Sequence, residues 1–156
     1  MSTREFEEME RLTQQPLLLA PNRVFRSYTG GALLEALQGE AHPKDAHFPE
    51  EWVGSTTATR LSGRPRDEGL SRVAAAGERH VLLKTLIETF PDAMLGAAHV
   101  AQYGKNLGVL CKLLDAATRL SIQTHPTRAF ARQHLRSDFG KTESWIIIGT
   151  REIGGE

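Results

Sequence analysis

The 156-residue sequence balances 19 Lys and Arg side chains against 19 Asp and Glu side chains, and its 40% hydrophobic content is typical of a soluble globular domain. A formal net charge of zero provides no concentrated positive field, so we expect neither nucleic acid nor a membrane surface as a partner. The single cysteine, Cys111, excludes an internal disulfide and a cysteine-rich zinc finger. The polar amino terminus and the shortness of the apolar runs predict no signal peptide and no membrane span, so we expect a cytoplasmic protein.

Residues 1–15 are predicted to form a helical extension. Ser2 and Glu5 have the spacing of a capping box, and the apolar residues that follow recur every third position. Pro16 ends this pattern. Residues 16–26 combine two prolines with Val24 and Phe25, which favours short strand pieces at a sheet edge.

The middle of the chain is predicted to contain two helices separated by a strand. Leucines on one face predict a helix at 32–39 that ends near Gly39. Residues 51–61 are rich in Val, Thr and Trp and predict a strand. Residues 81–95 carry the clearest helical stripe, with Pro91 near a break.

The last third is predicted to be mainly β. Residues 107–114 and 118–125 have the composition of two strands joined as a hairpin, residues 127–135 predict a helix, and residues 145–152 predict a final strand. The whole order predicts a mainly β fold with helical insertions, of the α+β class.

Three polar residues recur at alternate positions of the segment 118–125. In a strand, Ser121, Gln123 and His125 would share one face, where an amide oxygen and an imidazole nitrogen could hold one Zn²⁺ ion. The alternative is a hydrogen-bonded strand end, closed by Pro126, that binds no ion.

A second polar segment, residues 140–145, enters the next predicted strand and can bring Glu143 beside Gln123 and His125. A zinc ion held by one carboxylate with neutral ligands remains a strong Lewis acid that polarises a carbonyl or hydroxyl oxygen. Lys141 lies two residues before Glu143 and could hold an anion or an enolate oxygen. The alternative is an exposed Lys/Glu turn followed by a core residue, Trp145.

These two blocks, Ser-Ile-Gln-Thr-His-Pro at 121–126 and Gly-Lys-Thr-Glu-Ser-Trp at 140–145, resemble the signature blocks of type I phosphomannose isomerases. The Lys-bearing segment 112–116 and the Glu-x-Trp-x-Gly pattern within 50–55 resemble further strands of that family. The resemblance implies a zinc-dependent cupin that interconverts mannose 6-phosphate and fructose 6-phosphate through a cis-enediol intermediate. It also implies that residues 16–156 are the amino-terminal portion of a cupin domain.

The resemblance also assigns roles to individual residues. It implies three zinc ligands, one active-site lysine and three positions that line the substrate pocket. These are, in that order, Gln123, His125 and Glu143; Lys141; and Ser121, Lys112 and Glu50.

Two departures from the family pattern affect these expectations. The family usually has Trp-Gly where this chain has Thr29-Gly30, which removes an aromatic wall near the pocket. The fourth zinc ligand, a histidine, and the arginine that the family uses in catalysis have no counterpart in the 156 residues. We therefore expect an incomplete jelly roll whose open sheet edges could self-associate. The alternative function is a non-catalytic module that binds zinc or a sugar phosphate, or an inactive fragment that needs a partner to close its barrel.

Overall fold

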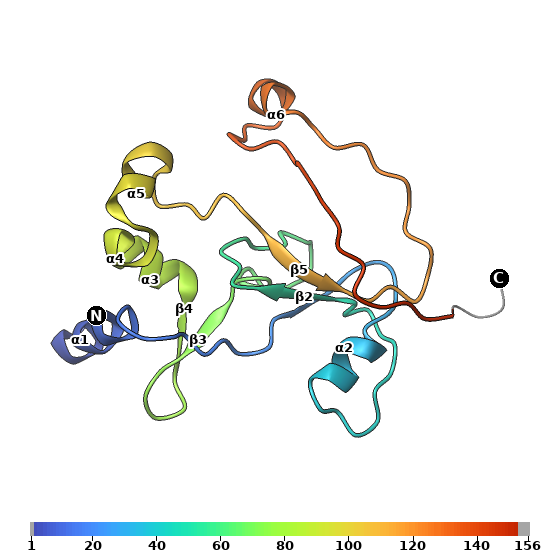
Figure 1. Cartoon of the computed structure of the whole chain (residues 1–156), viewed down its shortest axis with the longest axis horizontal. Helices are drawn as coiled ribbons and strands as arrows, with labels where there is room; N and C mark the ends of the chain where they lie inside the picture. Colours follow the sequence, from blue (N-terminus) through green and yellow to red (C-terminus); the bar gives the residue numbers. More distant parts are fainter. Residues whose placement is uncertain (1, 153–156) are drawn as a thin grey trace.

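The computed structural model describes residues 2–152 and shows two small antiparallel sheets with helices around them (Figure 1). One sheet has three strands in the order β1 (Arg23–Val24), β2 (Glu50–Val53) and β5 (Cys111–Leu114). The other pairs β3 (Arg72–Ala74) with β4 (His80–Leu82). This mixture agrees with the predicted α+β content, and the strands within residues 2–152 do not close into a barrel.

The helices include the four that were predicted, which are shorter than predicted, and one at Ala97–Tyr103 that was not predicted. They are α1 (Thr3–Leu12), α2 (Ala32–Leu37), α3 (Leu83–Thr89), α4 (Pro91–Leu95), α5 (Ala97–Tyr103) and α6 (Arg128–His134). Within the described part of the chain, every helix is too short or too polar to traverse a lipid bilayer.

The single helix predicted at 81–95 is divided in the structure. Residues 80–82 form β4, which pairs with β3, so the helix begins only at Leu83. Pro91 disfavours helical backbone at Phe90, whose φ and ψ are −125° and 57°. A new helix, α4, therefore starts with proline in its first turn, where the missing N–H costs nothing.

Helix α1 forms as predicted and packs into the main apolar cluster. The Ser2 hydroxyl accepts from the Glu5 amide while the Glu5 carboxylate accepts from the Ser2 amide, which is the capping box predicted from the sequence. Met9 and Leu12 are buried, and they share a cluster with four side chains of β3 and α3. Those four are Val73, Leu83, Leu86 and Ile87.

The strand predicted at 51–61 is limited to β2. Gly54 has φ of 61°, in the left-handed region, and ends the extended backbone immediately after Val53. Residues beyond it turn into a loop, where the Ser55 amide donates to the Ser71 hydroxyl at 2.8 Å.

Two other predicted strands and one hairpin are wrong for this structure. Residues 118–125 and 145–152 form no strand in the described part of the chain, and β5 pairs with β2 instead of with the segment 118–125. In Figure 1 the chain after β5 leads away from the sheets to α6, and the chain after α6 returns toward the sheets, where Arg151 approaches Asp115 to 3.1 Å. A strand needs a hydrogen-bonded neighbour, and within residues 2–152 neither segment has one.

Candidate functional site

The face of the three-stranded sheet that carries Glu50 gathers charged and aromatic side chains. Glu50 and Trp52 are two residues apart on β2, so their side chains point to the same side. Lys112 on β5 lies directly opposite Trp52, and Val24 on β1 lies opposite Glu50. The antiparallel register therefore brings Lys112 beside Glu50, and the two charged groups approach to 3.2 Å.

Glu50 is buried and accepts from several donors. Arg26 binds both carboxylate oxygens, through Nε at 2.8 Å and Nη2 at 2.9 Å. The Tyr28 hydroxyl and the Trp52 indole N–H each donate to the carboxylate at 2.6 Å. Arg26 and Lys112 also lie 4.9 and 5.0 Å from the centroid of the Trp52 ring, within range of cation–π attraction.

These contacts determine the protonation state of the cluster. Burial alone would raise the pKa of Glu50, but the hydrogen bonds from Arg26, Tyr28 and Trp52, together with the charge of Lys112, lower that pKa to about 2. Burial and the hydrogen bond to Glu50 raise the pKa of the Tyr28 hydroxyl. At neutral pH the carboxylate is therefore ionised and the phenol is neutral.

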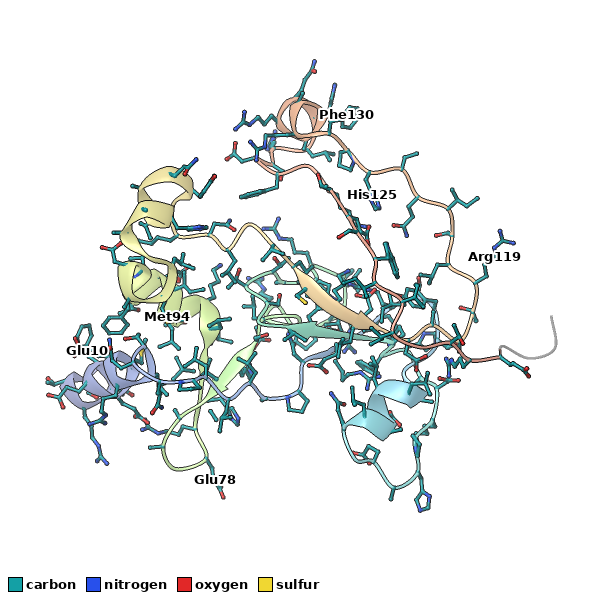
Figure 2. The ribbon with its side chains drawn as sticks, viewed as in Figure 1. Glu10, Glu78, Met94, Arg119, His125 and Phe130 are labelled. Carbon is teal, nitrogen blue, oxygen red and sulfur yellow. The ribbon has the colours of Figure 1, made fainter. Side chains whose placement is uncertain are left out.

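A second group, which we call the His125 cluster, consists of His125, Lys141 and Glu143. His125 Nε2 lies 3.1 Å from Glu143 Oε2. The Lys141 ammonium lies 3.0 Å from His125 Nε2 and 3.1 Å from Glu143 Oε2. His125 projects from the segment that leads to α6 into the space beside the returning segment (Figure 2). The side chains of His125 and Glu143 are about one-quarter exposed, at 28% and 26%.

The close approach of two chain segments beside α6 positions the His125 cluster. The Lys141 amide donates to the Pro126 carbonyl at 3.0 Å, which joins the two segments directly after His125. A Cβ atom at Gly140 would lie 2.7 Å from the Pro126 carbonyl oxygen and 2.8 Å from the Arg128 amide nitrogen. Glycine is therefore required at position 140 for this approach.

The seven residues implied by the sequence fall into three sets. The structure brings His125, Lys141 and Glu143 together, and it separately brings Glu50 and Lys112 together. The remaining two side chains are exposed and make no hydrogen bond within residues 2–152; these are Ser121 and Gln123. No group of three or more His, Cys, Asp or Glu side chains in that range is arranged to hold a metal.

Three partners of Glu50, namely Arg26, Tyr28 and Trp52, were not predicted as site residues. Trp52 could have been found, because the Glu-x-Trp pattern places both side chains on one face of a strand. Tyr28 stands beside the unusual Thr29 and supplies an aromatic ring next to Glu50. Arg26 carries no local signal, since its contact with Glu50 depends on the pairing of β1 with β2.

Two side chains of the His125 cluster, His125 and Glu143, are of kinds that bind metal ions. Two ligands that share a tetrahedral zinc ion at 2.0–2.1 Å lie roughly 3.3 Å apart, and His125 Nε2 and Glu143 Oε2 are 3.1 Å apart. Imidazole nitrogen and carboxylate oxygen are both common zinc ligands. The Lys141 ammonium lies against both atoms.

Comparison with known proteins identifies the family. A family model for the catalytic domain of type I phosphomannose isomerase matches residues 29–142, which is well over half of the chain. The chain belongs to this family. The match includes every residue that the sequence assigned to the site except Glu143, which follows the matched range directly.

Several curated phosphomannose isomerases are similar to the chain. A putative mannose-6-phosphate isomerase, YvyI, of Bacillus subtilis is 32% identical over 144 residues, which are 90% of this chain and 40% of YvyI. The probable mannose-6-phosphate isomerase GmuF of the same organism is 47% identical over 31% of this chain and 16% of its own length. The mannose-6-phosphate isomerase of Salmonella typhimurium is 36% identical over 61% of this chain and 22% of its own length. The chain thus spans less than half of these relatives, and no solved structure matches it significantly.

Proposed function

We propose that the chain carries part of the active site of a cytoplasmic isomerase that interconverts mannose 6-phosphate and fructose 6-phosphate. Membership of the phosphomannose isomerase family supports this reaction class. The observation that carries the proposal for this chain is the contact among His125, Lys141 and Glu143, which come from two separate segments. In the proposed fold, residues 16–156 form the amino-terminal portion of a cupin jelly roll.

The proposed cofactor is Zn²⁺, with Gln123, His125 and Glu143 as ligands. The spacing of His125 Nε2 and Glu143 Oε2 supports this assignment for two of the three. Gln123 lies two residues before His125 and has no competing hydrogen bond within residues 2–152, so its amide oxygen is free to join them. Bound zinc would supply a Lewis acid for the sugar oxygens.

The other residues of the proposed site bind and orient the sugar phosphate. Aldose–ketose isomerisation moves a proton between C1 and C2, and negative charge develops on the neighbouring oxygens. Lys141 carries the positive charge nearest to the proposed zinc ligands and is assigned to hold such an oxygen. Three further residues are assigned to the substrate pocket: Ser121, Lys112 and Glu50.

The structure separates the roles of Glu50 and Lys112. The Glu50 carboxylate already accepts four hydrogen bonds and has a pKa of about 2, so it is a poor proton acceptor at neutral pH. Its proposed role is to hold Lys112, whose side chain is 25% exposed and can contact substrate.

Replacement of one ligand tests the metal assignment. We expect His125→Ala to weaken Zn²⁺ binding by at least about 10-fold, because the imidazole supplies one of the three protein ligands. The measurement is metal content and zinc affinity of the purified chain, with His134→Ala as the control, since His134 lies on α6 outside the cluster. Equal zinc content in His125→Ala and wild type would overturn the assignment.

A coupled isomerase assay with and without added Zn²⁺ tests the reaction itself. Zinc-dependent turnover of mannose 6-phosphate supports the enzyme. Zinc binding without turnover by this chain supports the alternative, a binding module that needs a partner to complete the site.

A further inference from the structure

We propose that the Lys141 ammonium and a zinc ion compete for His125 Nε2 and Glu143 Oε2, and that zinc binding releases the ammonium toward the substrate. The inference rests on the proposed zinc site and adds a coupling between metal loading and the availability of Lys141. The Lys141 side chain would alternate between the pair His125 and Glu143 and the bound substrate.

The geometry of the three groups carries this inference. The Lys141 ammonium, His125 Nε2 and Glu143 Oε2 form a triangle with sides of 3.0, 3.1 and 3.1 Å. The Lys141 ammonium therefore lies against both His125 Nε2 and Glu143 Oε2. These are the same two atoms that would bind zinc.

A positive group is favoured beside His125 Nε2 and Glu143 Oε2, because the Glu143 carboxylate attracts positive charge. The ammonium supplies that positive charge in this structure. A divalent cation at the same position would meet the ammonium at short range, where two positive charges repel strongly. Zinc and the Lys141 ammonium therefore compete for one position.

The backbone around Lys141 allows the side chain to leave without disrupting the cluster. The Lys141 amide remains bound to the Pro126 carbonyl at 3.0 Å, so the chain segment stays in place when the side chain rotates. The side chain is 46% exposed, which gives the ammonium a path out of the cluster. Once released, it remains within one side-chain length of the proposed zinc site and can bind an anionic sugar oxygen.

The first test measures how accessible the Lys141 amine is to an amine-reactive acylating reagent, with labelled sites located by mass spectrometry. We expect Zn²⁺ to increase the labelling rate of Lys141 severalfold in the wild-type chain and to have no such effect in His125→Ala. Lys105 is the internal control, because its ammonium donates to the Glu88 carbonyl at 2.9 Å, away from the site. Labelling of Lys141 that is unchanged or reduced by zinc would overturn the inference.

The second test measures zinc affinity by competition with a chromogenic chelator. We expect Lys141→Met, which keeps the length of the side chain and removes its charge, to bind zinc more tightly than wild type. Lys105→Met is the matched control and should not change the affinity. Equal or weaker binding by Lys141→Met would mean that Lys141 does not compete with the metal.

The two tests separate this inference from the proposed zinc site. Suppose that wild type binds zinc and His125→Ala does not, but that zinc leaves the labelling of Lys141 unchanged and Lys141→Met binds zinc no more tightly than Lys105→Met. Only the competition is then wrong. If wild type binds no zinc, both the site and the competition are wrong.

Discussion

Glu50 shows how one buried carboxylate organises side chains from β2, from β5 and from the segment that follows β1. It accepts from Arg26, Tyr28 and Trp52 and contacts Lys112. Removing its charge would leave two cations beside the Trp52 ring without their counter-ion. The carboxylate is therefore expected to stabilise the fold as well as to orient Lys112.

We expect Glu50→Gln to lower the free energy of unfolding by about 2–3 kcal/mol at pH 7, because it weakens charge-assisted hydrogen bonds that are largely protected from water. Urea unfolding followed by circular dichroism measures this loss. Glu40→Gln is the matched control, since Glu40 is exposed and its side chain makes no hydrogen bond within residues 2–152. Equal destabilisation by the two variants would contradict the role given to Glu50.

Wild type and Glu50→Gln should also differ in how their stability responds to acid. The pKa of Glu50 falls from an ordinary value of 4.5 to about 2 on folding, so below pH 4.5 the unfolded state binds more protons than the folded state. The stabilisation from Glu50 is therefore complete above pH 4.5 and is lost as the pH falls toward 2. Unfolding curves between pH 7 and pH 2 should show the difference between wild type and Glu50→Gln shrinking in that window; a difference that stays constant would be inconsistent with the lowered pKa.

At the scale of chain segments, the two loops on either side of α6 determine whether the His125 cluster can form. Gly140 permits their close approach, because a Cβ atom would meet the backbone of Pro126 and Arg128 at less than 3.0 Å. The glycine thus links a local backbone requirement to the position of Lys141 and Glu143.

We expect Gly140→Ala to weaken zinc binding by roughly 10-fold, since the returning segment must move away from His125 to accommodate the methyl group. The zinc affinity of the purified variant measures this effect. Gly149→Ala serves as the control, because a Cβ atom there has no neighbour within 4 Å. The role given to Gly140 would be refuted if both variants bound zinc as wild type does.

The sequence predicts helices and strands well where they depend on neighbouring residues, and poorly where they depend on a distant partner. The start of α1 depends on Ser2 and Glu5, which are three residues apart, and the sequence predicts it correctly. The strand predicted at 118–125 depends on a neighbouring strand, and no property of its own residues reveals that β5 pairs with β2 instead.

In the candidate site, too, contacts between motif residues could be predicted, whereas a contact that depends on sheet pairing could not. The contact of His125 with Glu143 follows from motifs that the resemblance had already placed together. The contact of Arg26 with Glu50 depends on sheet pairing across 24 residues and could not be predicted.

At the scale of the whole molecule, the carboxyl-terminal segment presents an unusual apolar surface. Ile146, Ile147 and Ile148 are 87%, 73% and 82% exposed, although three consecutive isoleucines are typical of a strand buried on both faces. In the described range, the apolar side chains of this segment are exposed to solvent and its backbone pairs with no strand. Such extended segments are ready templates for pairing with another chain.

We expect the purified chain to self-associate through this surface, with a sedimentation coefficient that rises with protein concentration. The double variant Ile146→Lys with Ile148→Lys should shift the chain toward monomer, because charge on an extended segment opposes pairing. Val109→Lys is the control, since Val109 is 66% exposed and lies outside the segment. Sedimentation of the wild-type chain as a monomer at all concentrations would exclude self-association.

The two tryptophans lie in opposite surroundings and give the molecule two distinct fluorescent reporters. Trp52 is 4% exposed and lies within cation–π range of Arg26 and Lys112, whereas Trp145 is 57% exposed and lies two residues after Glu143. Emission from Trp52 should therefore be blue-shifted and protected from iodide, while that from Trp145 should be red-shifted and readily quenched. Single-tryptophan variants would then allow events around Glu50 and events around His125 to be followed independently in the same solution.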